Sequence, residues 1–305
     1  MKTKYASACQ QSLTKRWGVL LLCASIFRTR SHQLFYKAKT MRSASVLILG
    51  LCTFISFPIA AETDEQAIVR KLANPLSTLI QIPIDFSFDR NLGLDDEGER
   101  AVMTIKPVIP FSISENWNII SRTVVPTVSL DVPGRGSESG LGDAVQSIFF
   151  SPKTVGDSGW IWGVGPVFVL PTSTNDFTGA GEWGAGVTAV ALKQQSKSWT
   201  YGALVNSIRD VDGDTPIETS LVQPFISYRT ANAVSFSLNA EATYDGQIDE
   251  WSVPLKLSAS KLFRFGKLPV SLGGGIRYWA DSPSAGPESW GAVLTMNVIL
   301  PSGGQ

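Results

Sequence analysis

Six charged residues lie in the middle of segments that otherwise alternate between apolar and small or polar residues. These six residues are Asp85, Lys106, Arg122, Glu241, Lys256 and Arg277. Four are bases and two are acids, so the set carries excess positive charge. We expect all six to line one lumenal cavity, where such groups could attract and steer a small anion, as the basic rings of anion-selective pores do. They could equally pair with one another, which is the rule for ionisable groups inside membrane spans.

The surrounding segments determine which of these readings is possible. In 251–259 the odd positions are apolar and the even positions are mostly small or polar. Successive side chains of a β-strand point to opposite faces, so this pattern predicts a strand with one apolar and one polar face. Many such runs, each about 10 residues long and several beginning with tryptophan, are typical of a transmembrane β-barrel.

The repeated alternation predicts an all-β fold, a transmembrane antiparallel up-and-down β-barrel of about 12 strands. A weak helical pattern over 65–73 predicts a short N-terminal helix, placed at the periplasmic mouth, inside the lumen or in a frayed tail. The expected strands are 77–88, 101–111, 117–130, 144–151, 160–170, 183–192, 199–208, 221–228, 234–244, 251–260, 270–279 and 290–300.

The connections between these strands differ in charge. The loops after odd-numbered strands hold 19 acids and 4 bases, and the mostly shorter turns after even-numbered strands hold 2 acids and 7 bases. Long and short connections must alternate in this way when both termini lie at one face of an even-stranded barrel. The acidic loops are expected at 89–100, 131–143, 172–182, 209–220, 245–250 and 280–289.

Tryptophans are expected to form two belts, because indole rings favour membrane–water interfaces. Trp117, Trp160 and Trp199 begin upward strands and are expected at the periplasmic rim. At the outer rim, where downward strands begin, we expect Trp183, Trp251 and Trp290.

Prolines and glycines inside the expected strands predict local irregularity. Proline donates no ladder hydrogen bond, so bulges are expected at Pro83, Pro107, Pro126, Pro166, Pro224 and Pro254. The run at 273–275 lies mid-strand with no following helix, which predicts a kink in the barrel wall and not a phosphate-binding loop.

The first 61 residues differ from the rest. They contain nine Lys or Arg, no Asp or Glu, and all three cysteines and the single histidine. Residues 42–61 have the basic, apolar and small-residue regions of a secretory signal, with cleavage expected after Ala61. Met41 is then the expected start and 1–40 an upstream extension, unless both form one long signal. The remaining expected parts are an N-terminal periplasmic or lumenal segment (62–76), the barrel (77–300) and a tail (301–305), in the cell outer membrane.

Residues 62–305 contain no cysteine or histidine. This predicts a protein that is not an enzyme, with no cofactor and no metal site, because hydroxyl nucleophiles need an adjacent base and zinc or copper sites rely on these ligands. The sequence from Asp210 to Asp214 resembles the start of a calcium loop, but its glycine is misplaced and the twelfth-position glutamate is missing. The acidic surface argues against nucleic acid.

Several stretches resemble an outer-membrane family described as the putative meta-pathway of phenol degradation family. They include residues 74–83, 117–126, 140–152, 160–166, 223–225 and 278–283. The resemblance covers about 74–300 and implies an outer-membrane barrel of transporter type, with no catalytic residues to carry over. The final strand also resembles the pattern that barrel-assembly machinery reads, although it lacks a terminal aromatic residue.

The leading functional prediction is a channel or transporter for a small hydrophobic or aromatic solute, including anionic ones such as an aromatic carboxylate. Twelve strands lie between barrels filled by side chains and open porins, so a narrow or gated path is expected, occluded by 62–76. The alternative is a non-transporting barrel with a structural role, or one that binds a ligand or partner through its acidic outer loops. A soluble periplasmic β-sandwich is a third reading. Expected partners are the lipid bilayer, lipopolysaccharide, the barrel-assembly machinery and the small-molecule solute.

Overall fold

A computed structural model describes residues 64–93, 95–133, 136–211 and 217–300. The predicted signal region with its start at Met41, residues 62–63 and the tail 301–305 lie outside this described part, as does most of the calcium-like stretch, including Asp212 and Asp214. Among the described residues, no helix has the length and apolar character needed to cross a membrane.

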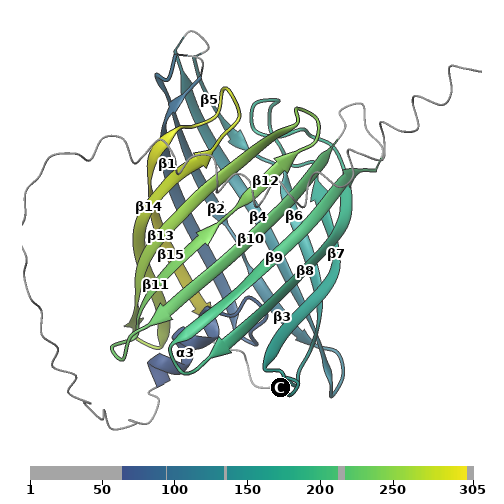
Figure 1. Cartoon of the computed structure of the whole chain (residues 1–305), viewed down its shortest axis with the longest axis vertical. Helices are drawn as coiled ribbons and strands as arrows, with labels where there is room; N and C mark the ends of the chain where they lie inside the picture. The colour runs from purple at the N-terminus through teal and green to yellow at the C-terminus, as the bar shows by residue number, and fades with distance from the viewer. Residues whose placement is uncertain (1–63, 94, 134–135, 212–216, 301–305) are drawn as a thin grey trace, which may run out of the picture. The chain divides into compact units, whose positions relative to one another are not determined.

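The described chain has one helix followed by strands (Figure 1). Helix α3 spans Asp64–Leu72. The strands are β1 (Ile80–Leu92), β2 (Gly98–Ile105), β3 (Val108–Ser112), β4 (Trp117–Val132), β5 (Gly136–Leu141), β6 (Ala144–Pro152), β7 (Trp160–Leu170), β8 (Gly184–Gln195), β9 (Trp199–Asp210), β10 (Glu218–Arg229), β11 (Val234–Ala240), β12 (Ala242–Asp245), β13 (Glu250–Phe265), β14 (Leu268–Asp281) and β15 (Ser289–Leu300).

These segments make a closed antiparallel barrel of 12 transmembrane strands, which confirms the predicted fold class. Three transmembrane strands are each built from two collinear pieces, β2 with β3, β5 with β6, and β11 with β12. Neighbours in space are neighbours in sequence, and β15 closes the barrel on β1 from Ile80↔Leu300 to Phe88↔Ala292. We call the end that holds α3, Ile80 and Leu300 the lower end, and the opposite end the upper end (Figure 1).

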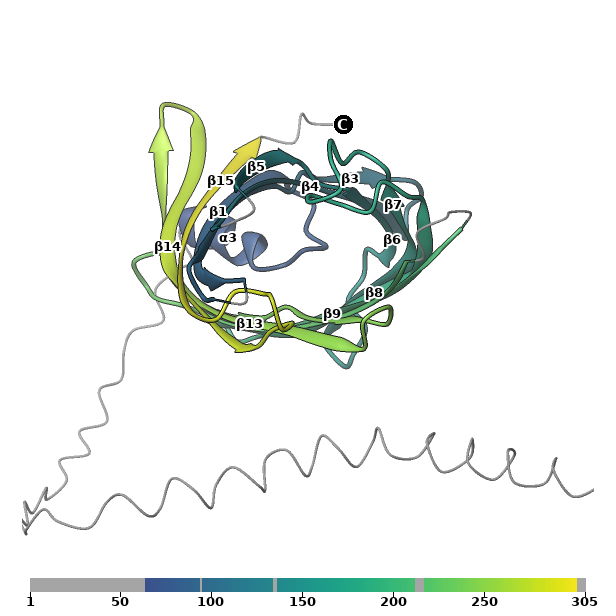
Figure 2. The same ribbon diagram turned by 90° about the horizontal axis from the view of Figure 1, so that it is seen from above.

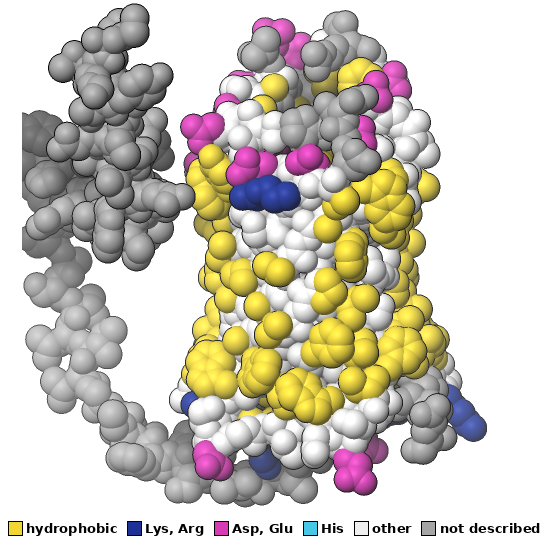
Figure 3. Space-filling model, turned by 90° about the vertical axis from the view of Figure 1, so that its right-hand side faces the viewer, with side chains coloured by type: hydrophobic (Ala, Val, Ile, Leu, Met, Phe, Trp, Pro, Cys, Tyr) yellow, Lys and Arg dark blue, Asp and Glu magenta, His cyan; other side chains and the backbone are white. Residues whose placement is uncertain are grey.

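Alternation along each strand separates a lipid-facing surface from a lumenal one. On β13, Leu255 and Leu257 are exposed on the outside, and Lys256 and Ser258 line the lumen. Large apolar side chains cover the waist of the barrel, and acidic side chains gather above them (Figure 3). Apolar side chains facing outward can be stable in this number only against hydrocarbon.

The barrel is oval in cross-section, with β14 at one end of the oval and β7 and β8 at the other (Figure 2). Glycines lie at both corners. A Cβ on Gly165 or Gly186 would be 1.9 Å from a carbonyl oxygen of a neighbouring strand, and one on Gly275 would be 2.1 Å from the carbonyl oxygen of Leu257. Only glycine permits so close an approach of neighbouring backbones. The predicted kink at 273–275 therefore coincides with one corner.

The three strand interruptions all involve proline and a charged residue. Lys106 and Pro107 separate β2 from β3, and Lys106 N–H donates instead to the Pro83 carbonyl at 2.8 Å. Glu241 separates β11 from β12 opposite the register shift at Pro254. A proline has no N–H to donate to the neighbouring strand, so the strand pairing is interrupted there. A residue at the interruption need not follow the alternation of inward-facing and outward-facing side chains.

The third interruption, at Gly142 and Asp143, lies opposite Pro126, whose carbonyl accepts from Gly142 N–H at 2.9 Å. The expectation of a bulge at every proline was wrong. Four of the six pair in regular register, namely Pro83 with Asn297, Pro126 with Thr104, Pro166 with Val187 and Pro224 with Ala203. Of the six, only Pro254 lies at a register shift in the described pairings. The limits of two expected loops were also wrong. Most of 89–100 and 131–143 is strand, because the β1–β2 and β4–β5 hairpins continue above the apolar waist.

Candidate functional site in the barrel lumen

Five of the six charged residues expected in the lumen meet at mid-barrel. Asp85 lies on β1, Arg122 on β4 and Lys256 on β13, while Lys106 and Glu241 occupy strand interruptions. Lys106 Nζ lies 2.9 Å and Lys256 Nζ 3.7 Å from Asp85 Oδ2. The two lysines thus flank one carboxylate. We call these five residues the central cluster.

Glu241 completes the cluster from the interruption between β11 and β12, beside β13. Its Oε1 lies 4.0 Å from Lys256 Nζ and accepts a hydrogen bond from Gln223 Nε2 at 3.1 Å. Arg122 lines the same cavity but forms no ion pair or hydrogen bond with any described residue. The cluster contains three bases and two acids, so one positive charge is left over.

The sixth residue, Arg277, belongs to a separate group nearer the upper end. Its guanidinium forms two hydrogen bonds with Asp89, one of them from Nε at 2.9 Å. Asp89 is fully buried and also accepts from Arg100 Nη2 at 3.1 Å and Trp279 Nε1 at 3.1 Å. Both guanidinium groups also lie over the Trp279 ring, at 5.2 and 5.1 Å. We call these four residues the upper cluster.

Sequence reasoning missed three members of the upper cluster, Asp89, Arg100 and Trp279. Asp89 and Arg100 were assigned to the ends of a loop, although they pair across β1 and β2 as Asp89↔Arg100. The signal that could have found them is parity. Asp89 continues the odd-numbered series of Asp85 and Ser87, and residues of one parity face one side of a strand.

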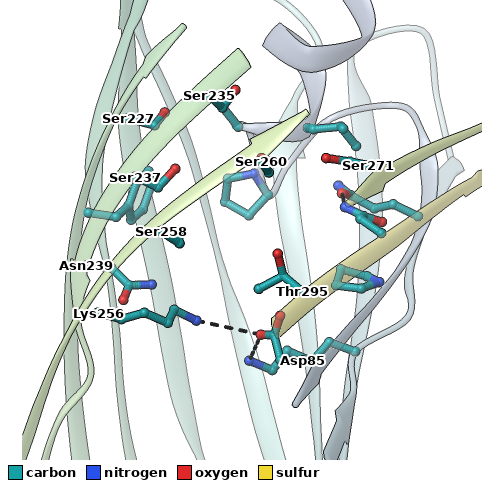
Figure 4. Close-up of a pocket in the computed structure, with 18 of the residues that line it drawn as sticks. Asp85, Ser227, Ser235, Ser237, Asn239, Lys256, Ser258, Ser260, Ser271 and Thr295 are labelled. Atoms are coloured by element: carbon teal, nitrogen blue, oxygen red, sulfur yellow. Dashed lines mark hydrogen bonds and ion pairs between the residues drawn. The ribbon is translucent and has the colours of Figure 1, made fainter. Parts of the chain in front are cut away.

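A cavity of about 340 Å³ lies below the central cluster. Its wall carries hydroxyl and amide side chains, its floor is apolar and comes from the N-terminal segment, and its ceiling is the central cluster. Figure 4 shows the wall serines between helix α3 and the ion pair of Lys256 with Asp85. The hydroxyl wall consists of Ser227, Ser235, Ser237, Ser258, Ser260, Ser271 and Thr295.

The N-terminal segment 64–79 closes much of the lower end. Val69, Leu72, Ala73 and Pro75 line the cavity floor. Beyond the helix, Asn74 Oδ1 accepts from Leu76 N–H at 2.8 Å, a local turn that follows the helix end before proline.

Leu76 then anchors this segment inside the barrel. It packs with buried inward-facing residues of five strands, Val108, Ile120, Phe149, Val190, Leu192 and Leu204. Polar contacts hold the helix itself. Gln194 Nε2 donates to the Arg70 carbonyl at 2.8 Å, Arg229 donates to the Gln66 carbonyl, and Arg264 Nε lies 3.3 Å from Glu65 Oε1. The segment is therefore docked at several independent points.

The six tryptophans expected in belts lie at both ends of the barrel. Trp117, Trp160 and Trp199 begin strands at the lower end and Trp251 and Trp290 at the upper end, while Trp183 precedes β8 there. All six are well exposed. Several pair with another aromatic ring, for example Tyr278 with Trp290 at 4.9 Å and Trp199 with Tyr228 at 4.8 Å between centroids.

No protein-family model and no curated protein matches this sequence. Among solved structures, the chain is similar to an outer membrane channel from Pseudomonas putida F1, with 12% identity, coverage of 73% of this chain and 96% of that chain, and a TM-score of 0.57. It also matches the beta domain of the Bordetella autotransporter BrkA, at 11% identity, 73% and 100% coverage and a TM-score of 0.43. A Salmonella typhi outer membrane phospholipase matches at 11% identity, 79% and 99% coverage and a TM-score of 0.43.

The first of these similarities shows a shared barrel fold. The resemblance to the family described as the putative meta-pathway of phenol degradation family stays a prediction, because no family model matches.

Proposed function

We propose that this chain is an outer-membrane channel that passes a small organic solute through the barrel lumen and catalyses no reaction. The observation that carries this proposal is the lumenal cavity, about 340 Å³ in volume, between the central cluster and the N-terminal segment. An apolar outer surface with a polar, charged interior cavity is the arrangement of barrels that conduct solutes. The barrel similarity to an outer membrane channel supports the same proposal.

The solute class follows from the cavity lining. The sequence predicts a hydrophobic or aromatic solute, and the apolar floor around Val69 and Leu72 suits such a body. The hydroxyl wall and the central cluster suit polar groups. The proposal therefore covers a small solute with both polar and apolar parts.

The N-terminal segment would limit the conductance. Because Leu76 fills the lower lumen, the wild-type channel should conduct weakly, and loosening Leu76 should enlarge the path. The test is planar-bilayer conductance of the protein purified from the outer membrane, for wild type and Leu76→Ala. Leu257→Ala is the matched control, because Leu257 faces outward and is 51% exposed.

Channel function predicts a steady wild-type conductance that rises severalfold in Leu76→Ala and stays unchanged in Leu257→Ala. Silence of both the folded wild type and Leu76→Ala would contradict it. That result would favour a second candidate function, a barrel with a structural role that transports nothing. Two observations support this second candidate: the lower lumen is filled, and ion pairs bridge the walls of the lumen.

A further inference from the structure

The charge balance of the cavity points to an anionic ligand. Asp85 is shared by Lys106 and Lys256, and Glu241 lies against Lys256 and Gln223. Arg122 is left without an ion pair or hydrogen bond among the described residues. A cation inside a membrane span is costly unless water or an anion compensates it. One negative charge would neutralise the cluster.

A guanidinium group selects among anions by its shape. Its planar fork matches the two oxygens of a carboxylate, and such charge-assisted pairs are stronger than neutral hydrogen bonds. The cluster has a single positive charge in excess, which a monocarboxylate would match and a dicarboxylate would exceed. Arg122 is therefore suited to one carboxylate group.

The wall below Arg122 suggests what the rest of the ligand carries. Cross-strand pairing places Ser227 opposite Ser237, Ser237 opposite Ser258, and Ser235 opposite Ser260. None of these five hydroxyls makes a hydrogen bond to another described side chain or backbone group. They form a patch that can donate and accept hydrogen bonds.

Two amide oxygens give an independent indication. Asn239 and Asn297 line this cavity, and their Oδ1 atoms are buried and accept no hydrogen bond within the described part of the chain. Asn297 Nδ2 donates to Gln81 Oε1 at 3.0 Å, which fixes the orientation of that amide. A buried acceptor without a donor loses free energy, so these oxygens need donor groups from a ligand or water. Hydroxyl groups on a ligand would supply them.

We propose that the lumenal cavity is a binding site for a small hydroxylated monocarboxylate. Its carboxylate pairs with Arg122, and its hydroxyl groups form hydrogen bonds with the hydroxyl wall and with Asn239 and Asn297. This inference rests on the proposed function and specifies the polar groups of its solute. Arg122 is the specificity-determining residue, because it recognises the charged group. Glu241 opposes anion binding, since its carboxylate lies in the same cluster.

The probes are three six-carbon compounds. D-gluconate has a carboxylate and hydroxyls, hexanoate has only the carboxylate, and sorbitol has only the hydroxyls. Binding is measured by titration calorimetry on the folded protein in detergent, with empty micelles as the blank. Wild type should bind gluconate at least tenfold more tightly than hexanoate or sorbitol. A ligand without hydroxyl groups leaves the hydroxyl wall without hydrogen-bond partners, and a ligand without a carboxylate leaves Arg122 without a counter-charge.

Variants separate the contribution of Arg122 from general charge effects. Arg122→Gln should weaken gluconate binding by tenfold or more, because it removes a charge-assisted bond. Glu241→Gln should strengthen it severalfold while keeping an amide beside Gln223. Arg90→Gln is the matched control, since Arg90 is exposed and pairs with Glu99 away from the cavity. It should bind like wild type.

The outcomes distinguish this inference from the proposed function. Equal or tighter binding of hexanoate, undetectable gluconate binding, or full binding by Arg122→Gln would overturn the hydroxylated-carboxylate site even if bilayer conductance is normal. Gluconate binding that depends on Arg122 in a protein that conducts nothing would support the site and reject the channel.

Discussion

Arg277 reaches Asp89 across an intervening strand. Its Nε donates to Asp89 Oδ1 at 2.9 Å, although β15 separates β14 from β1. The β15 residue that pairs with Arg277 is Gly291, and a Cβ there would lie 2.5 Å from Asp89 Oδ1. The missing side chain of Gly291 thus leaves the space in which the two charged groups meet.

Gly291→Ala should therefore disrupt the upper cluster. The added methyl group would contact both Asp89 and the Phe88 carbonyl oxygen, at 2.5 and 2.7 Å, so backbone or side chains must shift. Overpacking of this kind costs about 1–3 kcal/mol. Gly274→Ala is the control, because its Cβ would meet no atom nearer than 3.5 Å. Urea unfolding in lipid vesicles should show a loss for Gly291→Ala alone.

Asp89→Asn should be more damaging than its conservative size suggests. The carboxylate is fully buried and serves Arg100, Arg277 and Trp279, so an amide leaves two guanidinium groups without a counter-charge. Removing one member of a buried ion pair costs about 3 kcal/mol. The unfolding midpoint in urea should fall accordingly, whereas the exposed Asp131→Asn should leave it unchanged. Equal stability of both variants would show that the upper cluster contributes little.

The strands of this barrel were predictable because their pattern is local. Alternation and rim tryptophans require no knowledge of distant contacts, so twelve strands could be counted from residue types alone. The pairing of charges was harder to predict. Arg277 was expected in one group with the five residues of the central cluster, yet its partner is Asp89 two strands away. The pairing of Arg277 with Asp89 depends on the curvature of the barrel wall and on Gly291. The alternation of apolar and polar residues along a strand contains no information about either.

The docking of Leu76 also lay beyond sequence reasoning. Its neighbours come from five strands spread over β3 to β9, and nothing in the local sequence of 74–79 specifies them. Two of these neighbours, Phe149 and Leu192, lie on β6 and β8, which carry none of the six charged residues singled out from the sequence. Their role in holding the N-terminal segment appears only when the barrel is closed.

Gln194→Ala should loosen helix α3. Gln194 Nε2 donates to the Arg70 carbonyl at 2.8 Å, and one hydrogen bond contributes about 1 kcal/mol, roughly a fivefold change in the docked population. Proteolytic cleavage within 64–72 should accelerate by a similar factor. The neighbouring Gln195→Ala is the control, because Gln195 is exposed. If both variants are cleaved at the wild-type rate, this contact does not hold the helix.

Asp85→Asn should make the lumen more selective for anions. Asp85 compensates both Lys106 and Lys256, so its neutralisation would raise the excess charge of the central cluster from one positive charge to two. Under a salt gradient, the reversal potential should shift by several millivolts or more toward the equilibrium potential of the anion. Asp131→Asn, above the apolar waist, provides the control. An unchanged reversal potential would place the selectivity filter elsewhere.

Trp290→Ala should weaken membrane anchoring at the upper end. Trp290 is exposed and lies 4.9 Å from the Tyr278 ring, so truncation removes an interfacial indole and an aromatic contact of about 1 kcal/mol. Stability in vesicles should fall, while stability in detergent, which lacks a defined bilayer interface, should fall less. Equal losses in both would point to packing alone.

Because glycines at both ends of the oval allow close approach of neighbouring strands, the number of strands alone does not predict which molecules fit into this lumen. In a round tube, clearance grows with the number of strands, but this barrel is oval in cross-section (Figure 2). The shorter axis of an oval lumen sets its clearance, whatever its total area. Permeation should then discriminate by molecular thickness, so that a flat or extended molecule enters where a compact sphere of equal volume is refused.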